Sequence, residues 1–270
     1  MPQTLLRFVH LSDTHYTDPA YEPDTALHHP RQTTHWLVEE IKQLPFQPDL
    51  ILHTGDVLNR PQPHLYEPIK ALFAEIDTPT TYVVGNHDDS DALQRVLLER
   101  ETVQTPLWRE EIFGDVRFLF LDANHPDVDP PAGRFDTEQL EWLEHQVSTD
   151  DPRPIVVALH HPVLKTHTSA WYDDFMNTEN GEKVHKILAP ASDRVRGVFS
   201  GHIHHNLTFM QDGILYSSVR SSWTQFDIVP HQGLETRHDP NADPGYNVVT
   251  ITDVGTYVQQ YTYRVDSQNS

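Results

Sequence analysis

Residues with metal-binding or proton-transfer chemistry follow short apolar runs in this 270-residue sequence. Each group combines aspartate, asparagine or histidine, and glycine stands directly before three of the groups. The positions are Asp13 with His15, Asp56, Asn86 with His87, His160, and His202 with His204. Carboxylate and imidazole ligands together suit zinc, manganese, iron or cobalt, and they do not match a site for calcium or magnesium alone.

The number of these groups predicts two metal ions rather than one. A single tetrahedral ion would leave several ligands unused, whereas two ions can share the set if one carboxylate bridges them. Asp56 is the expected bridge because it stands alone between the paired groups. Asp13 with His15, and His202 with His204, have i, i+2 spacing, which in an extended chain places both side chains on the same side. Glycine permits the unusual backbone angles and close approach that such a loop requires.

Composition narrows the class of protein and of partner. The chain has 19 histidines and no cysteine, which excludes disulfides and thiolate metal sites. Lys and Arg number 19 against 40 Asp and Glu, giving a formal charge of −21. This charge argues against a nucleic-acid partner or an anionic membrane surface. No apolar run reaches about 18 residues, and Met1 to Arg7 show no secretory signal, so a cytoplasmic protein is expected.

The sequence pattern predicts which elements hold these groups. Strands and helices alternate over most of the chain, and short hairpins follow. This pattern predicts a layered α/β domain with a mixed sheet, whose strand ends would bring the polar groups to one edge. Strands are predicted at 5–9, 50–52, 80–84, 116–121, 155–159 and 195–199, helices at 33–44, 65–76, 91–101, 137–147 and 181–188, hairpin strands at 207–210, 214–216, 247–251 and 257–263, and loops at 126–131 and 229–244.

The other histidines receive different predictions. His10 and His53 are expected to be structural, and His185 is expected on the solvated face of a helix. His161 packs or contacts substrate, and a solvated position is expected for His205. The segment 162–180, which contains Trp171, Tyr172 and Phe175, either caps the pocket and stacks on an organic group, or serves packing or a dimer contact.

Five motifs in order resemble the full motif set of the calcineurin-like metallophosphoesterases across residues 5–216. They are Asp13-x-His15, Gly55-Asp56, Gly85-Asn86-His87-Asp88, His160-His161-Pro162 and Gly201-His202-Ile203-His204. The branch they resemble most is that of the class III cyclic nucleotide phosphodiesterases and their glycerophosphodiesterase relatives, to which residues 218–246 with Gln225 are loosely similar. The resemblance implies a four-layer α/β/β/α sandwich of two mixed sheets flanked by helices. A single domain spans 1–270, with C-terminal hairpins and substrate or dimer loops at 217–265.

The resemblance also implies a role for each motif residue. One metal is held by Asp13, His15, Asp56 and His204, and the other by Asp56, Asn86, His160 and His202. His87 faces the substrate phosphate and donates a hydrogen bond or proton to the leaving alkoxide, while a hydroxide held between the ions attacks phosphorus. Asp88 is the second expected catalytic residue, which orients a ring behind the ligands. The family suggests iron with manganese or zinc, and ligand types do not separate these metals.

The leading functional hypothesis is therefore a metal-dependent phosphodiesterase for small phosphodiesters such as 3′,5′-cyclic AMP. The alternatives are a broad phosphomonoesterase and phosphodiesterase with another native substrate, such as a glycerophosphodiester, and a metal-bound scaffold without turnover. A small-molecule phosphodiester is the expected partner, and the family makes a homodimer the oligomer to test.

Overall fold

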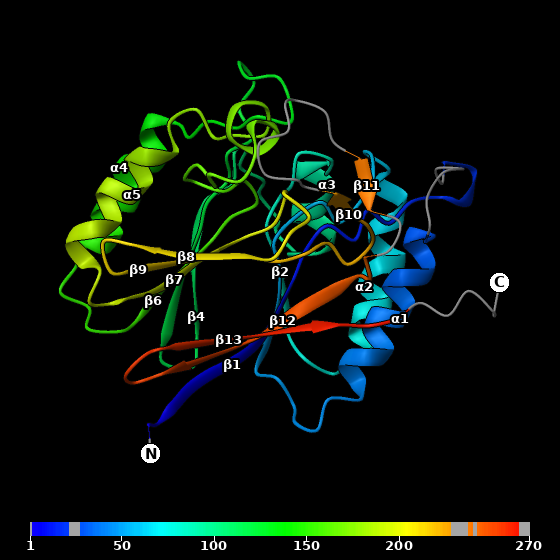
Figure 1. Cartoon of the computed structure of the whole chain (residues 1–270), viewed down its shortest axis with the longest axis horizontal. Coiled ribbons are helices and arrows are strands. Elements are labelled where there is room, and N and C mark those ends of the chain that lie inside the picture. Colours follow the sequence, from blue (N-terminus) through cyan, green and yellow to red (C-terminus); the bar gives the residue numbers. More distant parts are fainter. Residues whose placement is uncertain (1, 22–27, 228–236, 240–241, 265–270) are drawn as a thin grey trace.

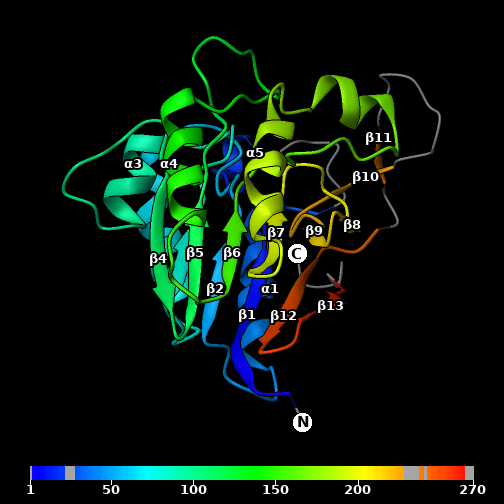
Figure 2. The same ribbon diagram turned by 90° about the vertical axis from the view of Figure 1, so that its left-hand side faces the viewer.

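The computed structural model describes residues 2–21, 28–227, 237–239 and 242–264 of the chain. Two β-sheets lie face to face, and helices cover the outer face of each sheet (Figure 1). Figure 2, turned by 90°, shows helices α4 (Thr137–Val147) and α5 (Gly181–Leu188) in front of one sheet, running roughly along its strands. This arrangement confirms the predicted four-layer α/β/β/α sandwich.

The first sheet has five strands in the order β13-β12-β1-β2-β3. Three of them, β1, β2 and β3, run parallel, while β12 and β13 pair antiparallel at one side. The bounds are β1 Thr4–Leu11, β2 Leu50–His53, β3 Thr80–Tyr82, β12 Gly245–Thr252 and β13 Thr256–Thr262. The parallel strands end at the same edge of the sheet, directly before three of the polar motifs.

The second sheet has six strands in the order β4-β5-β6-β7-β9-β8. The four inner strands run parallel, and the edge strands β4 and β8 pair antiparallel with their neighbours. The bounds are β4 Arg109–Phe113, β5 Val116–Phe120, β6 Ile155–Ala158, β7 Val195–Ser200, β8 Leu207–Gln211 and β9 Ile214–Ser218. The polar motifs of residues 160–162 and 201–204 follow the ends of β6 and β7.

The helices pack by their apolar faces against the two sheets. The first sheet carries α1, α2 and α3, and the second carries α4 and α5. Their bounds are α1 Pro30–Lys42, α2 Tyr66–Ala74, α3 Ser90–Val96, α4 Thr137–Val147 and α5 Gly181–Leu188. Helix α1 begins at a proline, whose fixed φ suits the first helical position, so it starts three residues before the predicted bound.

Large hydrophobic clusters fill the interfaces between the layers. Strand β1 shows how the alternation of a strand serves two of them: Phe8 lies in the cluster between the sheets, and Val9 lies in the cluster beneath the helices. The Phe8 ring meets Phe118 and Phe199 edge-on, with centroid separations of 5.6 Å and 5.4 Å. The two sheets are therefore joined by close aromatic packing.

Several sequence-based boundaries were wrong, and the causes are local. The helix predicted at 91–101 ends at Val96, because Glu99 has a φ of +52° that cannot continue a helix. Strand β4 was missed because it is a charged edge strand, unlike the apolar inner strands. The predicted loop 229–244 contains β11 Arg237–Asp239, which pairs with β10 Gln225–Asp227; residues 228–236 and 240–241 lie outside the described residues.

The prediction for His185 was also wrong. Its side chain is buried rather than solvated, and its ring nitrogens lie 2.8 Å from the Tyr216 hydroxyl and 2.9 Å from the Asp212 carboxylate. Among the described residues, no helix is both long and apolar enough to cross a membrane.

Removing the Phe8 ring tests the packing between the sheets. Because the side chain is fully buried between two aromatic neighbours, Phe8→Ala should lower the free energy of unfolding by about 3–5 kcal/mol. Urea denaturation measures the loss, with Tyr257→Ala as the control because Tyr257 is half exposed on the edge strand β13. The control should change stability by only about 0.5 kcal/mol. A loss below about 1 kcal/mol for Phe8→Ala would contradict this account of the core.

Candidate metal centre

The predicted site residues meet at the edge where five parallel strands from the two sheets end. Strands β1, β2 and β3 lead into the loops that carry Asp13, Asp56 and Asn86. Strands β6 and β7 lead into those that carry His160 and His202. The structure thus brings all seven predicted ligands together, from positions as far apart as residues 13 and 204.

The loops do not have the extended backbone expected from the i, i+2 spacing. Five of the seven predicted ligands have positive φ, between +47° for His15 and +70° for His202. The others with positive φ are Asp13, Asp56 and His204. Non-glycine residues occupy this region at an energetic cost and persist there only when their surroundings enforce it. The paired side chains therefore converge because of strained turns, not because of strand alternation.

The neighbouring glycines are required mainly for close approach. A Cβ on Gly85 would lie 2.1 Å from the Asp56 carboxylate oxygen Oδ1, and a Cβ on Gly201 would lie 1.9 Å from the Ser12 hydroxyl. Neither glycine has a positive φ. Any side chain at these positions would displace the loops that carry the candidate ligands.

One group of side chains contains Asp13, His15 and His204, all buried. The Nε2 atoms of His15 and His204 lie 3.0 Å apart. Asp13 Oδ1 lies 3.3 Å from His204 Nε2 and 3.8 Å from His15 Nε2. Its other oxygen, Oδ2, accepts a hydrogen bond from the backbone N–H of His202 at 3.0 Å. Three donor atoms thus surround one point, which a cation could occupy.

A second group contains Asp56, His160 and His202. Asp56 Oδ2 lies 3.3 Å from His160 Nε2, and His202 Nδ1 lies 3.1 Å from the same nitrogen. The side-chain oxygen of Asn86 lies 3.1 Å from it as well. Asp56 Oδ2 also lies 3.7 Å from His15 Nε2, so this carboxylate stands between the two groups, where a bridging ligand is needed.

Backbone carbonyls set the ring orientation of two of these histidines. His160 Nδ1 lies 2.7 Å from the Thr54 carbonyl oxygen, and His204 Nδ1 lies 2.7 Å from that of Thr224. Since a carbonyl only accepts hydrogen bonds, each Nδ1 carries a proton, and each Nε2 points toward the other donor atoms of the site. This arrangement is typical of metal-bound histidine.

Two other candidate ligand atoms have no hydrogen-bond partner among the residues that the structure describes. Asp13 Oδ1 and His202 Nε2 are buried and make no hydrogen bond. Buried acceptors without a hydrogen-bond partner are unfavourable, and a cation bound between them would offset this cost. The donor set therefore fits two cations, with three protein ligands or more for each.

His87 and Asp88 occupy different positions. His87 lines the cavity above the site, and its Nδ1 donates to the Asn59 carbonyl oxygen at 2.8 Å, which leaves Nε2 facing the cavity. The Asp56 carboxylate, opposed by burial, raises the pKa of His87. Asp88 contacts no ring of the site. Its carboxylate accepts hydrogen bonds from the backbone N–H of Gly85 at 2.9 Å and of Leu58 at 3.1 Å.

The Asp88 contacts join the loops after β2 and β3. A third backbone N–H, that of Val57, and the Tyr66 hydroxyl also donate to this carboxylate, at 3.3 Å and 3.1 Å. Burial raises the pKa of Asp88 to about 7. These contacts make Asp88 a positioning residue that ties together the loops of Asp56 and Asn86.

A cavity of about 260 Å³ opens over the two groups. Besides candidate ligands and His87, it is lined by neutral side chains: Asn59, Pro131, Met176, Trp223, Phe226 and His238. Sequence reasoning missed most of these, because they come from separate loops with no shared motif.

Within the segment 162–180, Met176 lines this cavity, whereas Tyr172 is buried and its hydroxyl donates to the Ile203 carbonyl oxygen. His161 is buried against the His202 ring, with centroids 4.4 Å apart, and does not line the cavity.

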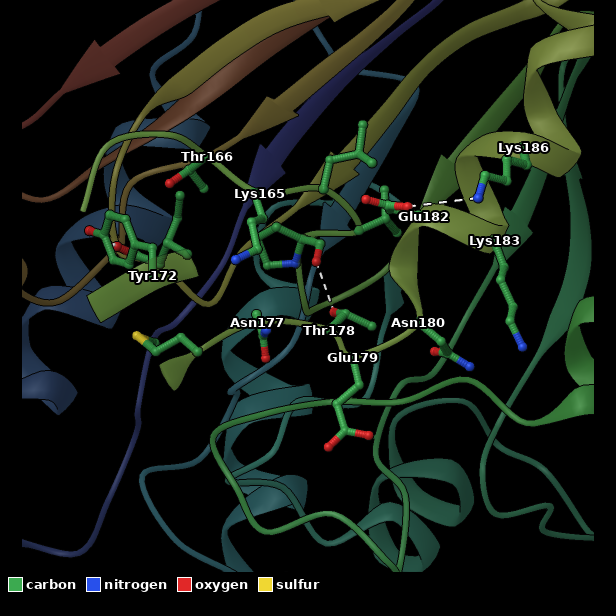
Figure 3. Close-up of a pocket in the computed structure, with 15 residues that line it drawn as sticks. Lys165, Thr166, Tyr172, Asn177, Thr178, Glu179, Asn180, Glu182, Lys183 and Lys186 are labelled. Carbon is green, nitrogen blue, oxygen red and sulfur yellow. Dashed lines mark hydrogen bonds and ion pairs between the residues drawn. The ribbon is translucent and has the colours of Figure 1, made fainter. Parts of the chain in front are cut away.

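A second cavity of about 280 Å³ lies next to the first, and Met176 lines both. Figure 3 shows its polar rim, which includes Lys165, Lys183 and Lys186. Lys186 lies 3.7 Å from Glu182, and Lys165 lies 3.0 Å from Asp174, so two of these ammonium groups have carboxylate partners. The rim is a mixed-charge surface rather than an anion site.

A layer of buried histidines lies beneath the candidate ligands. His53 accepts a hydrogen bond from the Gly55 N–H at 3.3 Å and contacts the Thr14 hydroxyl at 3.0 Å, while His10 contacts the Thr54 hydroxyl at 3.0 Å. Both side chains are fully buried, in agreement with a structural role. Burial, reinforced by His53, lowers the pKa of His10 to about 3. This layer is therefore neutral at ordinary pH.

The chain is similar in sequence to known proteins. Residues 6–206 match the family model described as calcineurin-like phosphoesterase. A cAMP/cGMP dual specificity phosphodiesterase of Mycobacterium tuberculosis is 28% identical over 180 residues, which cover 64% of this chain and 55% of that protein. A Rhodococcus erythropolis protein named "probable cyclic nucleotide phosphodiesterase" is 27% identical over 251 residues, covering 91% of this chain and 79% of the relative.

Among solved structures, a dimetal phosphatase from Danio rerio superposes with a TM-score of 0.64 at 15% identity, covering 96% of this chain and 100% of that one. At this level of identity the likeness concerns the fold alone.

The pH dependence of stability tests the neutral histidine layer in metal-free protein. The pKa of His10 in the folded protein lies below the unfolded value of 6.5. Burial of the neutral ring therefore leaves the free energy of unfolding unchanged above pH 6.5. As the pH falls from 6.5 toward 3, that free energy decreases because only the unfolded state binds the proton. His10→Gln should therefore flatten the fall in unfolding free energy between pH 6.5 and 4.5 by up to about 1.4 kcal/mol per pH unit. Urea denaturation with a chelator measures it, with the exposed His35→Gln as control. An equal slope in wild type and His10→Gln would show that His10 is not held neutral.

Proposed function

Because the chain belongs to the calcineurin-like phosphoesterase family, we propose that it is a dinuclear-metal phosphodiesterase for small phosphodiesters, with 3′,5′-cyclic nucleotides as the favoured substrates. The names of two relatives support the choice of substrate. The match spans only 55% of the first of these relatives. Any substrate recognition by the rest of that protein is therefore not assigned to this chain.

The observation that carries the proposal is the pair of ligand groups joined by Asp56. Asp13, His15 and His204 would hold one cation, Asn86, His160 and His202 the other, and Asp56 both. The cavity above them would admit the phosphate and one organic group. Two divalent ions in this position would supply the positive charge that binds a phosphate and activates water.

The chain itself would supply the acid at the leaving group. His87 faces the cavity through Nε2, while its Nδ1–H is held by the Asn59 carbonyl oxygen. The raised pKa of His87, caused chiefly by the Asp56 carboxylate, favours the imidazolium form. That form can donate the Nε2 proton to the oxygen that leaves phosphorus, which avoids release of a free alkoxide.

The neutral lining of the cavity supports a diester rather than a more highly charged substrate. No lysine or arginine is among the described residues that line it, so apart from His87 no protein side chain there offers a positive charge for a second phosphate. The chain as a whole has a formal net charge of −21, which disfavours the approach of polyanions.

A substrate panel tests the proposed reaction. Protein stripped with a chelator and reloaded with Mn²⁺ should hydrolyse bis(p-nitrophenyl) phosphate and 3′,5′-cyclic AMP with kcat/KM at least tenfold above that for p-nitrophenyl phosphate. The chelated protein should be inactive. Faster turnover of the monoester would move the assignment to a phosphomonoesterase, and metal binding without turnover of any ester would identify a scaffold.

Replacing His87 tests its assignment as the general acid. His87→Ala should lower kcat on 3′,5′-cyclic AMP by about 10²- to 10⁴-fold, because the alkoxide then leaves without a proton donor. Both metal ions should stay bound, as measured by elemental analysis after dialysis. His64→Ala is the matched control, since His64 is exposed and pairs with Asp18 outside the cavity. Unchanged kcat in His87→Ala would remove His87 from the mechanism.

A further inference from the structure

A short segment after β9, Ser221–Gln225, lies against one of the two ligand groups. We call it the serine loop. The Ser221 hydroxyl donates to the Asp13 carbonyl oxygen at 2.7 Å, and the Thr224 carbonyl oxygen accepts from His204 Nδ1 at 2.7 Å. The Trp223 ring lies against the His15 ring, with centroids 5.2 Å apart. The loop therefore touches every member of the group formed by Asp13, His15 and His204.

Ser221 is the centre of this loop. Besides donating to Asp13, its hydroxyl oxygen accepts hydrogen bonds from the backbone N–H of Trp223 at 2.9 Å and of Thr224 at 3.2 Å. The Gln225 side chain closes the turn, since it accepts from the Ser221 N–H at 3.1 Å and donates to the Ser221 carbonyl oxygen at 2.8 Å. Ser221 is fully buried. One hydroxyl thus fixes both the Asp13 backbone and the carbonyl that orients His204.

The position of Asp13 explains why such support matters. Its φ of +56° is unfavourable for a residue with a Cβ, so its backbone needs external hydrogen bonds to stay in that conformation. The Asp13 N–H donates to the Gly55 carbonyl oxygen at 3.0 Å, and the Asp13 carbonyl is held by Ser221. Loss of the second bond would let the peptide rotate and move the carboxylate.

The other ligand group receives its support elsewhere. Within the part of the chain that the structure describes, no hydrogen bond or ring contact joins the serine loop to Asp56, Asn86, His160 or His202. His160 is oriented by the Thr54 carbonyl oxygen, and the loops of Asp56 and Asn86 are tied by Asp88. The two groups share Asp56 and the bond from His202 N–H to Asp13, but their outer contacts are separate.

We propose that Ser221 is a positioning residue for one cation site only, the one formed by Asp13, His15 and His204 with Asp56. The inference rests on the proposed dinuclear function. It divides the centre into two sites with independent outer support, one held by the serine loop and the other by Thr54 and Asp88.

Calorimetric titration of chelator-stripped protein with Mn²⁺ tests the assignment without measuring turnover. His204→Ala and His160→Ala first identify which binding step belongs to which group. Ser221→Ala should then weaken the His204-dependent step about 10- to 100-fold and change the His160-dependent step less than about threefold. Ser222→Ala is the matched control, because its buried hydroxyl donates to the Gly245 carbonyl oxygen at 3.2 Å and not to the site. The control should leave both steps within about threefold of wild type.

Equal weakening of both steps by Ser221→Ala, or weakening of neither, overturns the inference. If Ser221→Ala does not fold, Gln225→Ala loosens the same loop while keeping the hydroxyl, and it should weaken the same step. A wild type that binds one equivalent contradicts the dinuclear function. In that case the Ser221 assignment stands if the single Mn²⁺-binding step depends on His204 and is weakened by Ser221→Ala. The assignment is wrong if this step depends on His160, or if no Mn²⁺ binds.

Discussion

The rest of the structure depends on one constraint, the close approach of imidazole nitrogens beside two buried carboxylates. The nitrogens of His15 and His204 lie 3.0 Å apart, and those of His160 and His202 lie 3.1 Å apart. Such an arrangement favours positive charge between the donor atoms, and no lysine or arginine is among the described residues that line the cavity above it. The surrounding structure must therefore hold the donor atoms in place for cations. It does so mostly with neutral groups, of which the carbonyl oxygens of Thr54 and Thr224 are the clearest examples.

The backbone strain at the site has a matching cause. Asp13, His15, Asp56, His202 and His204 all have positive φ, which costs free energy in a residue with a Cβ. The loops can keep this conformation because each begins at the end of a buried parallel strand and is tied to a neighbour by hydrogen bonds. Aromatic packing of Phe8 against Phe118 and Phe199 joins the two sheets whose strands lead into these loops. Core packing and site geometry are thus parts of one arrangement.

Much of the fold could be predicted because the inner strands are apolar and end in polar motifs. The errors fall where tertiary contacts decide. Strand β4 has the composition of an exposed segment and becomes a strand only by pairing with β5. His185 lies on a polar-looking helix, yet it is buried because Tyr216 and Asp212 provide partners from another part of the chain. Neither outcome has a local signal.

The sequence by itself determined which residue types could bind metal, their order along the chain and their place after strands, because these properties are local and repeat as motifs. Only the tertiary structure decided which atoms face each other, since that depends on contacts between residues as distant as Asp13 and Ser221. It also assigned Asp88 to backbone N–H groups rather than to a ring, and gave the cavity its neutral lining from separate loops. Long-range hydrogen bonds and packing carry this information, and no spacing rule encodes them.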